Sequence, residues 1–470
     1  MTPNRPDLES PETLLWQHIQ QARWYAGKGR DAELVALHPL PWLTPPGGAG
    51  AVRLLVAEVG NRDGDAETHH YLLALSYHGA DTTGDADSAI GRCADPELGE
   101  VVLHDATRDP LAQELLLAAV LGAGERSDDD ARLVAEFVDG SEVSASLPPR
   151  IFGGEQSNTS IMYGEVAMLK LFRRLELGDN LDIEIHRALA DGPAAADVAR
   201  LYGWLTAEWH DTGGASCRAD AAMLVEQLRE VSDGWQVAVA AAGSGDDFTG
   251  PAEELGRALR QVHEALAAAF GTGNRTGAGA AEQMTRRLAA AVREVPALAA
   301  YQPGLAAIFG TLADTELDTQ RVHGDFHLGQ TLVGADGGWK IIDFEGEPLK
   351  TLDERREPDT GWRDVAGLLR SLDYAGGFAE RSAGTDPAAA RGWVQQSSDA
   401  FLRGYTAGRA LTDAEHTVVA AYQADKAVYE VVYEARNRPD WLPIPLTALG
   451  ALAEHRSTDD PPHHDREAAR

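Results

Sequence analysis

Residues 321–348 read RVHGDFHLGQTLVGADGGWKIIDFEGEP, a stretch that predicts a strand, a tight turn, a catalytic loop and then a hairpin. Asp325 lies in the predicted loop, beside Gly324, which lets the backbone turn sharply. Asp343 closes the apolar run 339–342. Phosphoryl transfer needs a carboxylate that takes the proton of the attacking hydroxyl, and oxygen ligands for the magnesium ions that bridge the nucleotide phosphates. The stretch therefore predicts phosphoryl-transfer chemistry.

Each of these side chains suits one role. We expect Asp325 to be the catalytic base, and Gln330 and Asp343 to hold magnesium. An HGD triplet alone also suits a plain turn, but here the pattern HGDxHxxQ is followed thirteen residues later by an aspartate after an apolar strand. A structural loop has no reason to repeat this whole set. We expect the histidines, His323 and His327, to hold the loop rather than to transfer protons.

Composition narrows the class of protein. At 470 residues the chain is long enough for two or three domains. Its formal net charge of −33 argues against nucleic acid and anionic membranes as partners, because their phosphates would repel it. Two cysteines, Cys93 and Cys217, indicate a reducing compartment. We see no signal sequence and no apolar run of about 18 residues, so we expect a soluble, cytoplasmic protein.

The N-terminal region predicts a small unit of its own. Its pattern predicts one helix and three strands, over residues 11–22, 34–37, 53–59 and 71–77. The motif WYAGKGR, residues 24–30, sets aromatic residues beside basic ones, and we expect it to form an edge of the core, with a binding patch as the alternative. Residues 81–97 are dense in Asp and Gly and predict a flexible connection. A helix over 110–121 and a strand over 132–137 follow.

Lys170 also indicates a nucleotide site. The chain has only five lysines, so a lysine in an apolar strand is notable. It stands on the return strand, 166–172, of a predicted hairpin, where its ammonium could reach the α and β phosphates and pair with Glu184 of the next helix. A hairpin tip rich in Gly and hydroxyls offers donors to phosphate, namely Gly154, Ser157, Asn158, Thr159 and Ser160. The alternative is an ordinary hairpin whose lysine extends to solvent. No GxxxxGK[ST] motif occurs, which excludes a P-loop.

Helical patterns dominate after the motif MLVEQL, residues 223–228. We expect MLVEQL to be a hinge between lobes, with the backbone of Val225 and Glu226 binding adenine. Apolar residues at helical spacing then predict a long helix through Leu255, Leu259, Val262 and Leu266. The Gly-rich stretch 271–280 predicts a surface loop, since no strand precedes it, and a helix follows over 282–292.

The C-terminal part adds two features. Asp364 starts an apolar-periodic helix, and we expect it to brace the catalytic loop rather than only to cap the helix. The closing helix sets rings and charges on one face, namely Tyr422, Lys426, Tyr429, Glu430 and Tyr433. Such a face suits a sugar, but an interhelical ion-pair network would give the same pattern, and both remain open. Residues 439–445 are expected to end the helix, before a polar, disordered tail.

A family resemblance rests on the motifs WYAGKGR, GGEQSNTS, LKLFRRL, HGDFHLGQ, IIDFEGEP, DVAGLLRS and DKAVYEVVYEARNRPDWLPIPL. Together they resemble the actinobacterial maltokinases and their relatives, the glucosamine kinases, over nearly the whole chain. The resemblance implies an α+β, bilobal fold like that of eukaryotic protein kinases and aminoglycoside phosphotransferases, with the nucleotide between the lobes. It implies three parts, an N-terminal α/β cap over 1–97, a β-sheet nucleotide-binding lobe over 98–222 and a helical catalytic lobe over 223–470. It implies ATP and Mg²⁺ as cofactors, Asp325 as base, Lys170 with Glu184 on the phosphates, and Gln330, Asp343 and Glu345 on the metal.

Two departures from the maltokinase pattern bear on the acceptor. Maltokinases usually read Ser-Pro-Leu before RDVAG, where this chain reads Thr-Gly-Trp, and Trp362 would occupy the volume of a second glucose ring. Gln423 replaces a glutamate in the closing helix. An amino sugar needs carboxylates such as Asp425 or Glu430, because a buried cation without a partner is costly. We therefore expect glucosamine, phosphorylated on its 6-hydroxyl, with maltose phosphorylated on its anomeric hydroxyl as the alternative.

We expect the acceptor site to comprise Asp325, His327, Trp362, Tyr374, Gln423, Asp425, Lys426, Tyr429 and Glu430. A protein kinase would instead carry an HRD loop and an activation segment, which this sequence lacks. A non-catalytic sugar-binding regulator would have lost Lys170, Glu184, Asp325 or Asp343, and all four are present. The sequence thus predicts an ATP-dependent sugar kinase that acts as a monomer, with no nucleic-acid or membrane partner.

Overall fold

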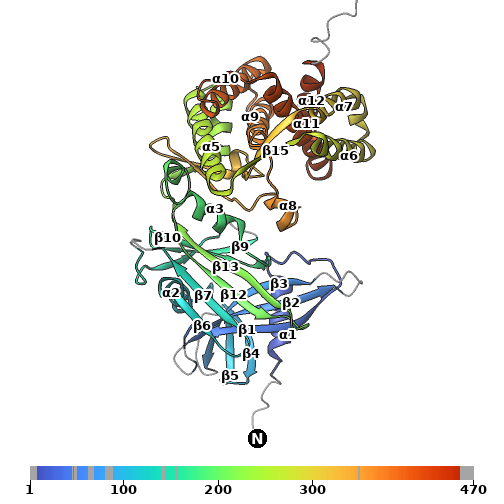
Figure 1. Ribbon diagram of the computed structural model, residues 1–470. Helices are drawn as coiled ribbons and strands as arrows, with labels where there is room; N and C mark the ends of the chain where they lie inside the picture. The colour runs from blue at the N-terminus through green and yellow to red at the C-terminus, as the bar shows by residue number, and fades with distance from the viewer. Residues whose placement is uncertain are drawn as a thin grey trace, which may run out of the picture. The chain divides into compact units, whose positions relative to one another are not determined.

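The computed structural model describes residues 8–44, 46, 50–61, 68–79, 88–138, 143–153, 157–347 and 350–455. The chain divides into two compact units (Figure 1). The first unit is Met1–Arg187 with Ala199–Arg229, and the second is Ala188–Val198 with Glu230–Arg470. No helix in the described ranges combines the length and the hydrophobicity that a bilayer span requires.

The first unit opens with an antiparallel sheet and one helix. Its elements are α1 (Pro11–Gln21), β1 (Ala32–Trp42), β2 (Ala51–Asn61), β3 (His69–Gly79), β4 (Ala89–Asp95), β5 (Gly99–Asp105) and β11 (Arg174–Leu175). The strand order is β1-β2-β3-β5-β4, and β11 pairs with β3. Alternate residues of β2 enter two different cores, one that includes α1 and one that includes the second sheet. Because both of its faces are covered, β2 is buried along nearly its whole length.

The helix and three strands predicted here are confirmed, and Trp24 and Tyr25 pack into the core as expected of the WYAGKGR motif. The flexible connection predicted over 81–97 is wrong for residues 89–95, because they form β4, which pairs with β5, and residues 81–87 lie outside the described residues. Only Cys93 of β4 is buried, so the strand carries too little hydrophobic alternation to be recognised. The boundary expected after residue 97 falls between these two paired strands, and the expected three-part division stays a prediction.

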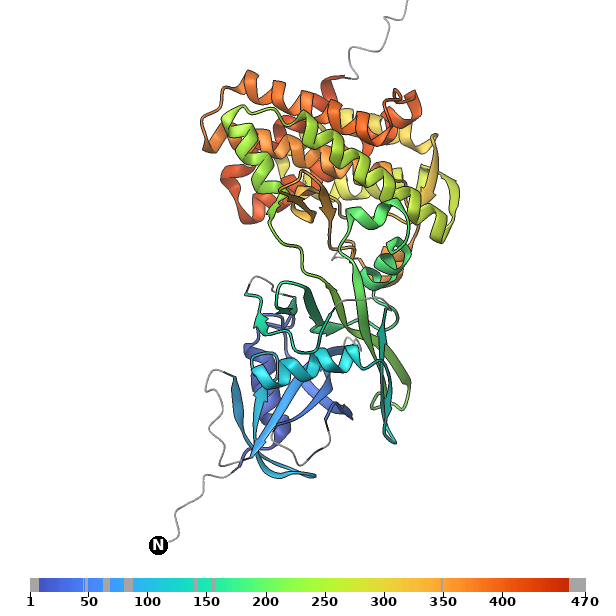
Figure 2. The same cartoon turned by 90° about the vertical axis from the view of Figure 1, so that its left-hand side faces the viewer.

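A second sheet carries the predicted hairpin. Its order is β6-β7-β12-β13-β10-β9-β8. The bounds are β6 (Gly124–Ser127), β7 (Arg132–Phe137), β8 (Pro149–Ile151), β9 (Asn158–Tyr163), β10 (Ala167–Phe172), β12 (Leu201–His210) and β13 (Ser216–Glu226), with helices α2 (Pro110–Leu121) and α3 (Leu181–Leu189). Buried residues of α2 join a core built from both sheets, and Figure 2 shows the helix lying across the strands. The prediction of α2 and β7 is confirmed at both ends of each element.

The second unit is mainly helical. Its helices are α4 (Gly234–Ser244), α5 (Thr249–Phe270), α6 (Ala278–Glu294), α7 (Gln302–Ala313), α8 (Leu352–Arg356), α9 (Trp362–Ser382), α10 (Pro387–Tyr405), α11 (Asp413–Asn437) and α12 (Pro443–His455). Its 3-10 helices are η1 (Pro193–Asp197), η2 (Pro296–Ala300), η3 (Leu328–Gln330) and η4 (Pro439–Trp441). Its strands are β14 (Val231–Asp233), β15 (Thr272–Thr276), β16 (Glu316–Gln320), β17 (Thr331–Gly334) and β18 (Trp339–Ile341). The four apolar residues that predict α5 are all buried.

One prediction for this unit is wrong. The Gly-rich stretch 271–280 is not only a loop, because it contains β15, which pairs with β16. Every residue of β15 is exposed, so no hydrophobic pattern marks the strand. Helix α11 ends at Asn437, just before Pro439, as predicted, and η4 and then α12 follow, with Pro443 in the first turn of α12. The tail predicted to be disordered begins at residue 457 and lies outside the described residues.

Candidate active site

The catalytic loop follows β16 and is held by Asp364 of α9. One carboxylate oxygen of Asp364, Oδ2, accepts the backbone N–H of His323 at 2.7 Å, and the other, Oδ1, accepts the N–H of Gly324 at 2.9 Å. Gly324 takes φ +86°, a conformation that favours glycine. Asp364 is 1% exposed, so both bonds form away from water. The expectation that Asp364 braces the loop is confirmed.

Two further residues of α9 extend this contact. A Cβ atom on Gly367 would lie 2.4 Å from the carbonyl oxygen of Phe326, so the helix and the loop touch backbone to backbone. Ser371 accepts the backbone N–H of Leu328 on its Oγ at 3.1 Å. Positions three and four residues apart share one helix face, so a single face of α9 contacts the loop over two turns.

His263 of α5 completes the brace. Its Nε2 donates to Oδ2 of Asp364 at 3.0 Å, and its Nδ1 lies 2.9 Å from the hydroxyl of Tyr405. Burial would raise the pKa of Asp364, but the hydrogen bond from His263 and the N–H of Gly324 hold it below its ordinary value. Our sequence reasoning missed His263. Its signal was a polar residue inside the buried stripe of α5.

The two loop histidines make contacts that fix the backbone. His323 directs Nε2 at the carbonyl of Ile342 at 3.0 Å, and its Nδ1 accepts the N–H of Asp325 at 3.4 Å. His327 accepts the N–H of Gly329 on Nδ1 at 3.0 Å and so caps η3. Burial lowers the pKa of His327 to about 4, so its ring is neutral near pH 7. These are the loop-holding contacts we expected.

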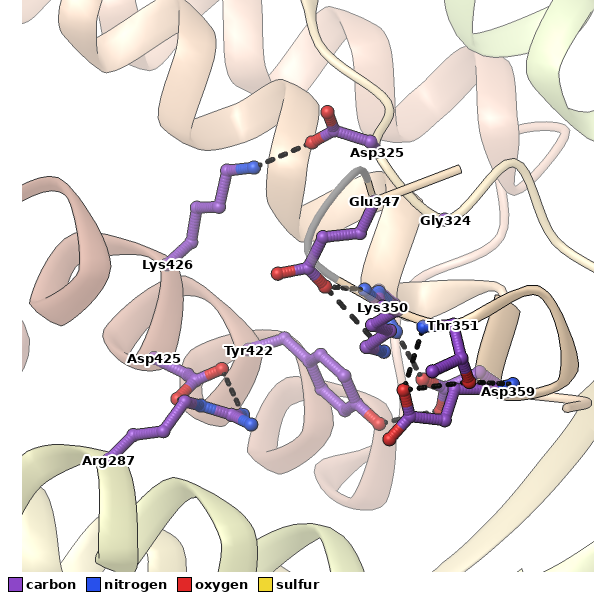
Figure 3. A network of polar contacts seen from close by, with 12 residues as sticks. Arg287, Gly324, Asp325, Glu347, Lys350, Thr351, Asp359, Tyr422, Asp425 and Lys426 are labelled. Carbon is purple, nitrogen blue, oxygen red and sulfur yellow. Dashed lines mark hydrogen bonds and ion pairs between the residues drawn. The ribbon is translucent and has the colours of Figure 1, made fainter. Parts of the chain in front are cut away.

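Asp325 forms an ion pair with Lys426 of α11 (Figure 3). The ammonium Nζ donates to Oδ1 of the carboxylate at 2.9 Å, and Nε2 of His327 lies 4.0 Å from Oδ2. Burial would raise the pKa of Asp325, but Lys426 holds it below its ordinary value. The same pairing raises the pKa of Lys426 despite burial. Both groups are therefore charged near neutral pH, and the carboxylate is in the form that accepts a hydrogen bond from a hydroxyl.

The two expected magnesium ligands are neighbours. Gln330 donates from Nε2 to Oδ2 of Asp343 at 3.0 Å, although thirteen residues separate them. Asp343 has φ +65°, which is uncommon outside glycine and indicates local strain. The pair offers carboxylate and amide oxygens, donors that suit Mg²⁺, so the residues present fit the metal. Glu345 accepts from Arg355 through its backbone carbonyl at 2.8 Å, and the metal role of its side chain stays a prediction.

The polar face of α11 forms ion pairs with other helices. Asp425 receives Nε and Nη2 of Arg287 on α6 at 2.9 and 2.6 Å, and Glu430 receives Nη2 of Arg370 on α9 at 2.5 Å. Gln423 lies half-buried on the same helix. Of the two interpretations left open for this face, these contacts are those of the interhelical ion-pair network. The carboxylates expected to be available for an amino sugar already pair with arginines.

This network continues toward the segment after Asp343 (Figure 3). The hydroxyl of Tyr422 donates to Asp359 at 2.8 Å, and Asp359 also receives Arg363 at 3.0 Å. Arg363 bridges to Glu347 at 2.9 Å, which lies 3.6 Å from Lys350. Burial and the neighbouring Arg363 lower the pKa of Lys350. Charged groups from three segments are thus fixed by one another.

Three other residues expected in the acceptor site contact side chains of the protein itself. Trp362 packs edge-on against Tyr405 with ring centroids 5.2 Å apart and borders the helical core. Tyr374 donates its hydroxyl to Glu434. Tyr429 is 45% exposed, and the ammonium of Lys426 lies 5.9 Å from its ring centroid. A contact of these side chains with a sugar stays a prediction.

In the first unit, Lys170 pairs with a carboxylate that the sequence reasoning missed. Its Nζ donates to Oδ2 of Asp182 on α3 at 3.3 Å. Burial would raise the pKa of Asp182, but Lys170 and His186 lower it strongly. Asp182 precedes the expected partner Glu184 by two residues, so the helix was correctly identified and the residue was not. The pairing of Glu184 stays a prediction.

The expected phosphate-binding tip needs correction, because three of its residues start strand β9, namely Asn158, Thr159 and Ser160. The hydroxyl of Thr159 accepts Nε of Arg173 at 2.8 Å, and Ser160 is fully buried. These two hydroxyls therefore serve the packing of the first unit. Ser157 is exposed just before the strand, and Gly154 lies outside the described residues.

The expected hinge also needs correction. Val225 and Glu226 lie at the end of β13, which pairs with β10 on one side and with β12 on the other. The N–H of Glu226 already donates to the carbonyl of Arg200 at 2.8 Å. A segment that links two lobes and the end of a central strand are both short and apolar, so the sequence pattern does not distinguish them.

Comparisons with known proteins cover most of the chain. Residues 18–109 match the maltokinase N-terminal cap domain, and residues 163–346 match the phosphotransferase enzyme family. A glucosamine kinase of Streptacidiphilus jiangxiensis is 31% identical over 337 residues, which are 65% of this chain and 73% of the relative. One of Mycolicibacterium smegmatis is 26% identical over 333 residues, 64% of this chain and 78% of the relative.

A solved structure also matches this chain. A glucosamine kinase in complex with glucosamine, ADP and inorganic phosphate has a TM-score of 0.65 and 25% identity to this chain, and the match covers 96% of this chain and all of that one. These findings confirm the expected α+β, phosphotransferase-like fold with a helical C-terminal part.

Proposed function

This chain belongs to the glucosamine kinase family, and from that premise we propose that it transfers the γ-phosphate of ATP to the 6-hydroxyl of glucosamine. The observation that carries the proposal is the Asp325–Lys426 ion pair at 2.9 Å, in a loop braced by a buried aspartate. It keeps the carboxylate that we propose as the catalytic base ionised and fixed in place.

The reaction asks little covalent chemistry of the protein. The sugar oxygen forms a bond to the γ-phosphorus, the bond from that phosphorus to the β,γ-bridging oxygen breaks, and ADP leaves with the electron pair. Asp325 orients the hydroxyl and receives its proton. Because Lys426 lowers the pKa of Asp325, the carboxylate is a weak base that suits a proton transfer late along a loose transition state.

Cationic groups would neutralise the charge of the phosphates. We assign Lys170, oriented by Asp182, to the α and β phosphates of ATP, with Glu184 as a further support. Gln330 and Asp343 would hold Mg²⁺, with Glu345 as a possible third oxygen donor. When bound, the metal offsets the negative charge of the phosphates during transfer.

The acceptor site is proposed on α9 and α11. Asp425 and Glu430 supply negative charge for the amino group of glucosamine, and their side chains, 19% and 15% exposed, stay open to a further partner beside their arginines. The remaining proposed acceptor contacts are His327, Trp362, Tyr374, Gln423, Lys426 and Tyr429. We further propose a monomeric, cytoplasmic enzyme. The maltokinase N-terminal cap match keeps maltose as the second candidate acceptor.

A coupled assay for ADP release tests the proposal over glucosamine, glucose, maltose and aminoglycosides. We expect turnover with glucosamine, whereas turnover with maltose alone would overturn the glucosamine assignment. The variant Asp325→Asn should lower kcat by about 10²–10⁴-fold while ATP binding stays nearly intact. The matched control Asp336→Asn alters an exposed turn in the β17–β18 hairpin and should keep wild-type kcat. A strong loss of ATP affinity in Asp325→Asn would contradict the role assigned to Asp325.

A further inference from the structure

The first unit contains two adjoining cavities around the WYAGKGR motif, which the proposed kinase reaction does not use. One has a volume of about 170 Å³ and lies among Tyr25, Arg30, Asn61, His69, Tyr71 and Arg174. The other, of about 190 Å³, shares Tyr25 and Arg30 and adds Lys28. We call the two together the cap cavity. Its walls come from the motif, from β2, β3 and β11, and from single residues of α1 and β1, so segments far apart in the sequence build it.

The charge of the cap cavity is opposite to that of the chain. Three cations line it, namely Lys28, Arg30 and Arg174, and no carboxylate is among its described lining residues. The whole chain has a formal net charge of −33, so a wall of this composition is unexpected by chance. All three side chains are exposed, which lets a ligand from solvent reach them. A local excess of cations attracts and orients an anion.

Both arginines line the same cavity as the Tyr71 phenol. Burial raises the pKa of Tyr71, and the positive charges of Arg174 and Arg30 act against this rise. Arg174 also donates from Nη2 toward Nδ1 of His69 at 3.4 Å. Two guanidinium groups beside a hydroxyl form a set of donors that matches the oxygens of a phosphate group.

The backbone of the motif is shaped to form this wall. A Cβ atom on Gly27 would lie 2.3 Å from the hydroxyl of Tyr25, so only glycine lets that ring close over the turn. Gly29 has φ +84°, where glycine is again favoured. The turn places Lys28 and Arg30 on either side of Gly29. Both glycines therefore serve the presentation of the cations, in addition to the packing of Tyr25.

The cavity also connects to the strand that follows the expected phosphate loop. Arg173 precedes Arg174, is 1% exposed, and lies over the ring of Trp24 at 5.2 Å. Its Nε donates to Thr159 of β9 at 2.8 Å, and its Nη2 donates to Thr107 at 3.1 Å. A ligand that contacts Arg174 therefore binds one residue away from the side chain that fixes β9.

We propose that the cap cavity is a binding site for a small phosphorylated metabolite, whose phosphate group is bound by Arg30 and Arg174 with Lys28 at its rim. The site uses none of the residues assigned to phosphoryl transfer, so it stands independently of the proposed kinase reaction. Its position beside Arg173 makes it a place where a metabolite can act on the nucleotide-binding sheet.

Calorimetric titration of the full chain tests the site, with glucose 6-phosphate and inorganic phosphate as probes. Saturating glucosamine, Mg²⁺ and a non-hydrolysable ATP analogue occupy the active site first. We expect one glucose 6-phosphate bound per chain, no binding of glucose, and weakening of about tenfold for each arginine lost in Arg30→Ala and Arg174→Ala. The matched control Arg92→Ala, an exposed arginine of β4, should bind like wild type. Arg30→Lys with Arg174→Lys should restore part of the affinity.

The titrations can either support or overturn the proposed binding site. Loss of binding in the alanine variants, with kcat for glucosamine unchanged and Arg92→Ala unaffected, supports the site. If neither probe binds the wild type, or if the double alanine variant binds both probes as the wild type does, the proposal is overturned. Wild-type turnover with glucosamine is measured separately, so failure of this site and failure of the kinase assignment give different results.

Discussion

Replacing Asp364 by asparagine tests whether the brace on the catalytic loop contributes to catalysis. In the native protein Oδ2 accepts from the N–H of His323 and from His263, while Oδ1 accepts from the N–H of Gly324. An amide has one acceptor oxygen. If the amide oxygen takes the place of Oδ2, the bonds from His323 and His263 remain. The NH₂ group then faces the N–H of Gly324, and that bond is lost. The variant therefore loses at least one hydrogen bond to a charged group, and the other two become neutral.

The magnitude follows from this count. Hydrogen bonds to charged groups contribute about 1.5–3 kcal/mol and neutral ones about 0.5–1.5 kcal/mol, so Asp364→Asn should lower the free energy of unfolding by about 3.5–6 kcal/mol. Asp364→Ala leaves three buried donors unsatisfied and should cost more. Gly324 directly precedes the base, and a displacement of about 1 Å costs on the order of 100-fold in kcat. The KM for ATP should change less than about threefold, as expected for loss of an interaction that acts in the transition state.

Urea unfolding and the coupled ADP assay check both numbers. Asp386→Asn is the matched control, because Oδ1 of Asp386 alone accepts both N–H groups at the start of α10, and an asparagine keeps both. Its stability should change by less than about 0.5 kcal/mol, since Asn and Asp are nearly equal helix caps. A folded Asp364→Asn enzyme with wild-type kcat would refute the positioning role.

Three further predictions concern charges. Lys426→Met removes the ammonium that lowers the pKa of Asp325, so the acid limb of the kcat–pH profile should move to higher pH, and an unmoved limb would contradict the pairing. Glu430→Ala leaves the buried guanidinium of Arg370 with only its more exposed partner and should cost about 3 kcal/mol in urea unfolding, whereas a loss under about 1 kcal/mol would argue against the buried pair. The pKa of His327 is lowered from 6.5 to about 4, so the unfolded chain takes up the proton first and stability falls as the pH drops through that range. His327→Asn, which keeps the cap of η3, should show a weaker dependence of the urea midpoint between pH 7 and pH 5.

Local patterns predicted much of the fold. Periodicity over many residues marked α2, β7 and α5, because each buries a regular stripe. Strands β4 and β15 were missed since they bury almost nothing and depend on backbone pairing with a neighbouring strand. Backbone pairing leaves little trace in the residue types of an exposed strand.

Part of the candidate site could likewise be predicted from the sequence, and part could not. Asp325, Gln330 and Asp343 could be assigned because they lie within nineteen residues, at a spacing typical of one chemistry. The partners of Lys170 and Asp364 could not be identified from the sequence. Asp182 and His263 are identified only by which helices pack together, and no single sequence states that packing.

The contact between α9 and the catalytic loop has a consequence for acceptor range. Helix and loop are joined at three points, since the side chains of Asp364 and Ser371 accept backbone N–H groups of the loop and Gly367 packs against the loop backbone. A change of sugar preference by substitution in α9 would therefore disturb the alignment of the nucleophile. Helix α11 contacts Asp325 through the long side chain of Lys426, so we expect substitutions elsewhere on this helix to disturb the position of Asp325 less than substitutions in α9.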